Sequence, residues 1–275
     1  TGLIVETGSW HWDKVANAEG YQIKINNVGQ NQTVNVTEYD SLTAGTSLAV
    51  QVKPYNNSGN YFSSWSEEKI VYILPAPTVS WNSDLELDGD ANNNFVWNAV
   101  SGAVGYSVEL EKDGIVNRTD YPSAQMAFGY AYSQVGVYKV RVKAVAEAGS
   151  DYYDSKYSKD IVVERLAAPQ ASGNNYITSD PSSLASGFTV NYTAVSGATG
   201  YQLYKDGALM EGKLSTVLAI SDNDVADDAI SAQQEYNYTV RSMGGVKNIS
   251  GSTYVFLPCL TESALSFKIT VQAMP

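Results

Sequence analysis

The sequence predicts an all-β protein made of three tandem immunoglobulin-like β-sandwiches arranged as an extended rod. Three observations predict this fold class. One block of ten residues occurs three times along the chain, its flanking segments alternate apolar and polar residues, and no segment of ten or more residues has the periodicity of an amphipathic helix. Short alternating segments separated by turn residues are typical of β-sandwiches.

The repeated block has the frame aromatic-x-x-Val-x-x-Ala-x-Gly-Tyr and spans residues 12–21, 97–106 and 192–201. A second block follows each copy at a comparable distance, at residues 48–53, 138–143 and 236–241. Two blocks that recur in the same order indicate homologous domains. We place them at residues 1–74, 75–166 and 167–275, the third with a longer insertion and a C-terminal strand.

Each block alternates with the period of two that a half-buried strand requires. The alternation predicts a set of inward-facing residues: Trp12, Val15, Tyr21, Ile23, Val50, Val52, Trp97, Tyr106, Val108, Val140, Val142, Tyr201, Leu203 and Val240. Two Asp-Gly pairs, at 113–114 and 206–207, predict hairpin turns of type I′. Residues 265–273 alternate as well, and they predict either the last strand of the third domain or an extra strand on an edge.

The junctions between the copies contain prolines, in the segments 74–77 and 166–169. Proline fixes φ and removes a backbone donor, so it is suited to the start of a new edge strand. Linkers this short do not behave as flexible tethers. We therefore expect the three domains to follow one another as an elongated rod.

These blocks resemble the fibronectin type III domains of secreted bacterial proteins. In that family a Trp on the second strand precedes a Tyr that opens the third, as Trp12 precedes Tyr21 and Trp97 precedes Tyr106. The third copy departs from this pattern, because it has Tyr192 where the first two copies have Trp12 and Trp97. The segment 63–66, Ser-Ser-Trp-Ser, resembles the closing element of the family. The resemblance implies a sandwich core, and an extracellular or cell-surface location in a bacterium.

Composition excludes several classes of function. The formal net charge of −12 argues against nucleic-acid binding, because binding to phosphates needs clustered basic residues. No apolar run approaches the ~20 residues that cross a bilayer, so we expect no membrane insertion. The single Cys259 excludes an intramolecular disulfide, and His11, the only histidine, is expected to face outward beside Trp12. We expect no catalytic residue and no enzymatic activity.

Two kinds of binding residue are candidates. Oxygen-rich loops of the kind that binds calcium contain Asp84, Glu86, Asp88, Asp222, Asp224 and Asp227, and they make calcium a possible cofactor, although such loops are more often solvated turns. Aromatic residues that could contact a ligand follow the second block in copies one and two: Tyr61, Trp65, Tyr152 and Tyr153. The other interpretation of these aromatics is that they close the sandwich and cover its sheets.

The sequence thus favours a non-catalytic spacer or adhesion segment of a bacterial surface or secreted protein, which presents or links other domains. The alternative is a carbohydrate-binding accessory region of a secreted polysaccharide-degrading enzyme. We expect a monomer without a required cofactor, and the sequence leaves open whether the partner is a protein or a glycan.

Overall fold

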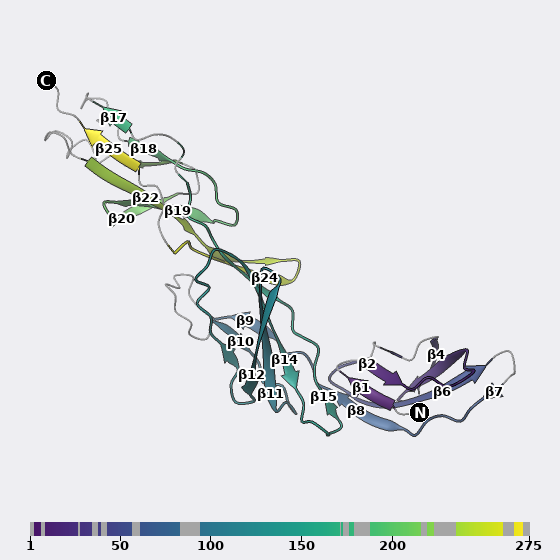
Figure 1. Ribbon diagram of the computed structural model, residues 1–275. Helices are drawn as coiled ribbons and strands as arrows, with labels where there is room; N and C mark the ends of the chain where they lie inside the picture. Colours follow the sequence, from purple (N-terminus) through teal and green to yellow (C-terminus); the bar gives the residue numbers. More distant parts are fainter. Residues whose placement is uncertain are drawn as a thin grey trace.

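The computed structural model describes residues 3–6, 9–26, 28–34, 38–39, 43–56, 61–82, 94–170, 172, 176–178, 188–215, 219–222, 235–260 and 267–271. All regular elements in these ranges are β-strands, so the predicted all-β class is confirmed. Three sandwich units follow one another along an elongated molecule, with a bend where β8 meets β15 (Figure 1). Within the described ranges, no helix has the length and apolarity needed to span a membrane.

Unit 1 contains the strands β1 to β8 in two sheets. One sheet has the order β1-β2-β5, and the other has the order β8-β6-β3-β4 with β7 paired to β6. The strands are β1 (Leu3–Glu6), β2 (Ser9–Trp12), β3 (Gly20–Ile25), β4 (Val28–Val34), β5 (Glu38–Tyr39), β6 (Ser47–Asn56), β7 (Tyr61–Phe62) and β8 (Lys69–Ile73).

Unit 2 repeats this arrangement. Its small sheet has the order β13-β10-β9, and its large sheet contains β12-β11-β14-β16. The strands are β9 (Val79–Trp81), β10 (Phe95–Trp97), β11 (Gly105–Lys112), β12 (Ile115–Pro122), β13 (Ala127–Phe128), β14 (Gly136–Val145) and β16 (Ile161–Arg165). The hairpin between β11 and β12 turns at Asp113 and Gly114, with φ of 52° and 79°, as the sequence predicts.

Unit 3 has a small sheet of β18 and β21 and a large sheet of order β17-β25-β22-β19-β20. The strands are β17 (Tyr176–Thr178), β18 (Phe188–Asn191), β19 (Gly200–Lys205), β20 (Ala208–Ser215), β21 (Ala219–Asp222), β22 (Glu235–Met243) and β25 (Phe267–Val271). Strand β25 pairs antiparallel with β22, as β8 pairs with β6 and β16 with β14. The alternating C-terminal segment is therefore the last strand of this unit, which was one of its two predicted roles.

The repeated ten-residue frame has the same structural role in each unit. In unit 2 the closing Tyr106 packs against the opening Trp97 with ring centroids 5.5 Å apart. The hydroxyl of Tyr106 accepts a hydrogen bond from the backbone N–H of Val100 at 2.9 Å. The same bond joins Val15 to Tyr21 at 2.8 Å and Val195 to Tyr201 at 2.7 Å. The frame therefore fixes the turn between the second and third strands of each sandwich.

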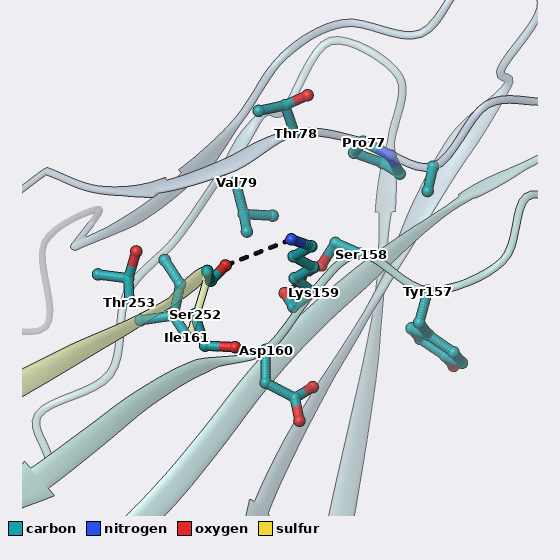
Figure 2. A pocket seen from close by; sticks show the side chains of 12 residues that line it. Pro77, Thr78, Val79, Tyr157, Ser158, Lys159, Asp160, Ile161, Ser252 and Thr253 are labelled. Carbon is teal, nitrogen blue, oxygen red and sulfur yellow. Dashed lines mark hydrogen bonds between the residues drawn. The ribbon is translucent and has the colours of Figure 1, made fainter. Parts of the chain in front are cut away.

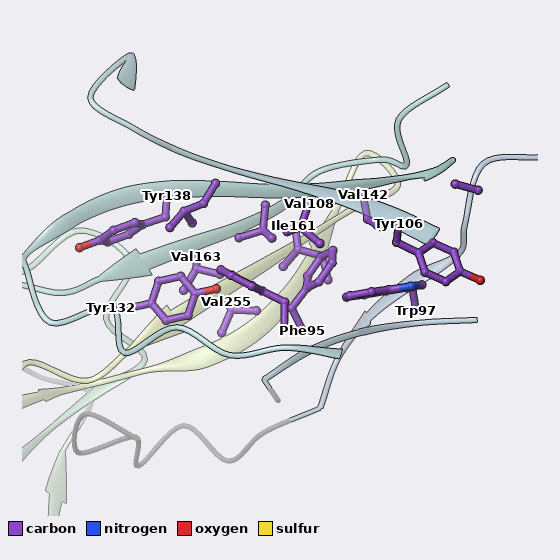
Figure 3. Packing of buried hydrophobic residues seen from close by; sticks show 14 of the residues in the cluster. Phe95, Trp97, Tyr106, Val108, Tyr132, Tyr138, Val142, Ile161, Val163 and Val255 are labelled. Atoms are coloured by element: carbon purple, nitrogen blue, oxygen red, sulfur yellow. The ribbon is translucent and has the colours of Figure 1, made fainter. Parts of the chain in front are cut away.

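The predicted core is confirmed: every residue of the inward-facing set is buried except Val15, which is partly buried against the core of unit 1. Figure 3 shows the core of unit 2, in which Phe95 and Trp97 of the small sheet face Val108, Val142 and Val163 of the large sheet. The core also contains Val255, which belongs to a segment about 90 residues farther along the chain than β16.

Candidate functional site

The junction between units 1 and 2 is closed by a strand that unit 2 adds to unit 1. This strand, β15 (Tyr152–Tyr153), lies in the connection between β14 and β16 and pairs in parallel with β8. The backbone N–H of Tyr72 donates to the carbonyl of Asp151, and that of Leu74 to the carbonyl of Tyr153, both at 2.9 Å. Unit 1 therefore donates two backbone hydrogen bonds to a loop of its neighbour.

The same arrangement, on a larger scale, closes the junction between units 2 and 3. The connection between β22 and β25 forms a hairpin of β23 (Gly245–Ile249) and β24 (Ser252–Leu257). Strand β24 pairs in parallel with β16 over five residues. The large sheet of unit 2 consequently has six strands, in the order β12-β11-β14-β16-β24-β23.

This hairpin lies within the predicted third domain, residues 167–275, but it hydrogen-bonds to the second. The predicted domain limits remain a prediction, and the strand pairing shows that neighbouring units share sheets across those limits. Periodicity in the sequence could not reveal this sharing. An alternating pattern indicates that a segment forms a strand, but it does not indicate the strand with which that segment pairs.

Side chains also cross the first junction in both directions. Tyr72 of unit 1 packs against the core of unit 2, and Leu74, which follows β8, is fully buried in that core. Tyr153 of unit 2 packs in return against the core of unit 1. The ring of Tyr152 lies 5.0 Å from that of Tyr72 and would contact any Cβ placed on Gly102. Each unit thus completes the core of the other.

At the second junction, β24 contributes Val255 and Leu257 to the core of unit 2. Arg165, at the end of β16, is 1 % exposed and makes hydrogen bonds to backbone carbonyls of both units. It donates to the carbonyl of Tyr132 at 2.9 Å, to that of Pro258 at 2.7 Å and to that of Ala131 at 3.5 Å. The buried guanidinium therefore links unit 2 to the end of the hairpin of unit 3.

Two further residues of unit 3 fit this junction closely. A Cβ on Gly244 would lie 1.8 Å from the carbonyl oxygen of Phe256, so no larger residue fits without a backbone shift. Cys259 is buried, and its Sγ accepts a hydrogen bond from the N–H of Ser242 at 3.3 Å. Burial gives this thiol a structural role.

Of the four candidate aromatics, the structure describes the side chains of Trp65, Tyr152 and Tyr153. Trp65 is half-buried on unit 1, where the ammonium groups of Lys53 and Lys24 lie 4.8 Å and 5.8 Å from its ring centroid. Tyr152 and Tyr153 are consecutive strand residues and so project from opposite faces of the sheet. Tyr61 lies in β7, and its side chain is outside the described residues. The three described rings therefore contact neighbouring side chains within the rod.

The outer face of unit 2 has a charged cluster around Tyr157. The Tyr157 hydroxyl donates to Glu109 at 2.6 Å, and Arg141 forms an ion pair with the same carboxylate at 2.7 Å. Burial opposes ionisation of Glu109, but the hydrogen bonds from Tyr157 and Arg141 outweigh it and lower the pKa of this carboxyl. Burial first, and then the bond to Glu109, raise the pKa of Tyr157 to about 12. The cluster holds Tyr157 against the sheet as a closing element.

A groove of about 450 Å³ lies between the start of β9 and the tip of the β23–β24 hairpin (Figure 2). Lys159 points toward the hairpin and donates to the carbonyl of Gly251 at 3.4 Å, whereas Asp160 points away from it. The hydroxyl of Ser158 is already engaged with the backbone of Val142 and Lys159.

The calcium candidates cannot be placed as a site. Asp84, Glu86, Asp88, Asp224 and Asp227 lie outside the described residues, and Asp222 is described only as part of the backbone of β21. Elsewhere in the described chain, no group of three or more His, Cys, Asp or Glu residues is arranged to hold a metal ion. Calcium binding by these loops stays a prediction.

No family profile and no curated relative matches the sequence. Among solved structures, the FN1–FN3 domains of chicken CNTN1 are similar with 14% identity and a TM-score of 0.28, over 98% of this chain and 97% of that one. A segment of two fibronectin type III domains from chicken tenascin is similar with 14% identity and a TM-score of 0.30, over 59% of this chain and 96% of that one. A cytokine receptor complex has 16% identity and a TM-score of 0.31, over 59% and 94% of the two chains.

Proposed function

We propose that this chain is a non-catalytic, extracellular spacer of a bacterial surface or secreted protein that holds other domains at a fixed separation and orientation. The observation that carries the proposal is the parallel strand added across each junction, β15 on β8 and β24 on β16. A spacer transmits orientation only if its joints resist bending, and shared sheets supply that resistance. A monomeric rod is sufficient for this role.

The free energy needed to open the second junction can be estimated from the contacts that must be broken. Detaching β24 removes Val255 and Leu257 from the core of unit 2, at about 1.5–3 kcal/mol for each side chain. It also breaks a five-residue ladder whose hydrogen bonds contribute about 0.5–1.5 kcal/mol each. Even about 4 kcal/mol keeps the detached state near one molecule in a thousand. The joint is therefore stiff at equilibrium.

The distance distribution between spin labels on units 2 and 3 tests this proposal. Thr119→Cys and Ala208→Cys place labels at exposed positions of β12 and β20, and the buried Cys259 does not compete for label. Double electron–electron resonance should give one narrow distribution. Gly244→Ala should broaden it, because the added methyl group displaces the backbone of Phe256.

Gly207→Asn is the matched control. Nothing lies within 4 Å of a Cβ at Gly207, and Asn accepts the φ of 78° found there. The distribution should stay narrow in this variant. A broad distribution in the unmodified chain, equal to that of Gly244→Ala, would show that the units bend freely and would refute the spacer role.

A further inference from the structure

The surface that receives the preceding unit at both junctions is present a third time, on unit 1. In unit 2 it is the turn 100–103 between the second and third strands, and in unit 3 it is the corresponding turn 195–198. The equivalent turn of unit 1 spans residues 15–18 and precedes Gly20, which pairs with Tyr55 near the end of β6, whereas β15 lies beside the start of β6. We refer to these three turns as the receiving turns.

Both occupied receiving turns are covered by the same two kinds of side chain. A Cβ on Gly102 would lie 3.0 Å from the ring of Tyr152 and 3.3 Å from Leu74. A Cβ on Gly197 would lie 2.4 Å from the ring of Phe256 and 3.2 Å from Leu166. The aromatic residue comes from the added strand of the same unit, and the leucine is the first residue after the last strand of the preceding unit. Both leucines are buried, at 0% and 1% exposure.

The receiving turn of unit 1 has the same backbone shape. Asn17 has a φ of 62°, in the left-handed region occupied by Gly102 at 85° and Gly197 at 84°. The N–H of Ala18 donates to the carbonyl of Val15 at 3.2 Å, as in the equivalent pairs of the other two turns. A groove of about 270 Å³ opens at this turn, lined by Val15, Asn17, Ala18, Pro54, Tyr55 and Asn56 among others. It occupies the place that the preceding unit covers in units 2 and 3.

The strand that follows β6 is where unit 1 differs from unit 2. In unit 2 the corresponding strand, β15, pairs with the neighbouring unit, whereas β7 in unit 1 folds back and pairs antiparallel with β6. Asn56 at the end of β6 donates to the carbonyl of Asn17 at 2.7 Å and so holds the wall of the groove to the receiving turn. The groove is thus preformed, and its lining includes the apolar residues Val15, Ala18 and Pro54.

We propose that this groove binds the end of a further β-sandwich unit of the same kind, which enters with the leucine that follows its last strand. The partner is defined by the two examples within the chain, Leu74 ahead of Pro77 and Leu166 ahead of Pro169. The apolar residues of the lining, Val15, Ala18 and Pro54, match a leucine side chain. Unit 1 is then a link in a longer row of sandwiches.

A peptide with the sequence of residues 161–169, Ile-Val-Val-Glu-Arg-Leu-Ala-Ala-Pro, serves as the probe of the whole chain. In ¹⁵N-labelled protein it should shift the backbone amide signals of Asn17, Ala18 and Asn56, with a dissociation constant on the order of 1 mM or below. A peptide in which aspartate replaces the leucine should bind at least ~10-fold more weakly, because a charged group then enters an apolar groove.

Two variants of the chain locate the binding. Ala16→Trp, at an exposed position in the lining of the groove, should abolish the signal shifts while leaving thermal unfolding unchanged. Ser101→Trp, at the equivalent exposed position of unit 2, should leave the shifts intact. Absence of shifts at 2 mM peptide would overturn the proposal, as would shifts that persist with the aspartate peptide or in Ala16→Trp. Equal shifts on addition of a soluble oligosaccharide would instead assign the groove to glycans.

This proposal extends the spacer function to a partner, and the two can fail separately. The peptide test concerns only the groove of unit 1, whereas the spin-label test concerns only the joint between units 2 and 3. A narrow distance distribution without peptide binding would leave a rigid spacer whose receiving turn in unit 1 has no such partner.

Discussion

Replacement of Arg165 by methionine should strongly destabilise the second junction. Arg165 is buried between the units, and its two short hydrogen bonds go to Tyr132 of unit 2 and to Pro258 at the end of the β23–β24 hairpin. Methionine preserves most of the packing volume, so the change removes chiefly the hydrogen bonds. The carbonyls that Arg165 now satisfies would stay buried and lose these donors.

The magnitude follows from the number of bonds. A hydrogen bond from a charged donor contributes about 1.5–3 kcal/mol, so the two short bonds contribute roughly 3–6 kcal/mol, and the bond of 3.5 Å to Ala131 adds little. Removing a buried charge also removes the cost of its desolvation, which offsets part of this loss. We expect a net loss of about 3 kcal/mol.

Urea unfolding followed by tryptophan fluorescence measures this loss. All five tryptophans precede residue 98, so their emission reports on units 1 and 2 and not on unit 3. With a slope of about 1–3 kcal/mol per molar urea, the transition of unit 2 should move down by about 1–3 M. Midpoints are the quantity to compare, since three coupled units do not unfold in two states.

Arg165→Lys is the conservative control. Its single ammonium group lacks the planar fork that reaches several carbonyls, so it should restore part of the lost stability and not all of it. The slope should stay at about 1–3 kcal/mol per molar urea. If the urea midpoint of Arg165→Met then lies within about 0.2 M of that of the unmodified chain, the guanidinium does not stabilise the junction.

Three further predictions test the shared cores, the charged cluster and the aromatic candidates. Tyr153→Ala, although it alters unit 2, should lower the unfolding midpoint of unit 1, because Tyr153 packs on the core of unit 1; circular dichroism should show the fold of unit 2 retained. Tyr157 should titrate near pH 12 by absorbance at 295 nm, and Glu109→Gln should lower that value. Because the pKa of Tyr157 is raised in the folded protein, its neutral form stabilises the fold. This contribution is fully present below pH 10 and is lost as the pH rises through 12. Trp65→Ala should lower stability by about 1 kcal/mol and change no binding on a glycan array, since Lys53 and Lys24 flank its ring; loss of a reproducible glycan signal would favour the carbohydrate-binding alternative.

The sequence was sufficient for the strands and the cores, because both depend on local periodicity. The frame that ends in Tyr21, Tyr106 and Tyr201 predicts a buried tyrosine in each unit, and its hydroxyl makes the same bond three times. The partners of β15 and β24 could not be predicted in this way. Strand β15 has only two residues, and β24 alternates like any strand, so neither carries a signal for pairing with another unit.

One local signal of the junctions was present in the sequence, in the residue at the left-handed position of each receiving turn. Asparagine and glycine both adopt this backbone conformation, so the turn alone does not distinguish Asn17 from Gly102 and Gly197. The difference is explained by the aromatic ring that packs on the turn in units 2 and 3, where a Cβ would come within 3.0 Å and 2.4 Å of it. In unit 1 the strand after β6 folds back on β6, and the turn there holds an asparagine. Glycine at this position therefore reports that an aromatic residue of the added strand packs on the turn, which links one residue of the repeat to the way in which units 2 and 3 are joined to the units before them.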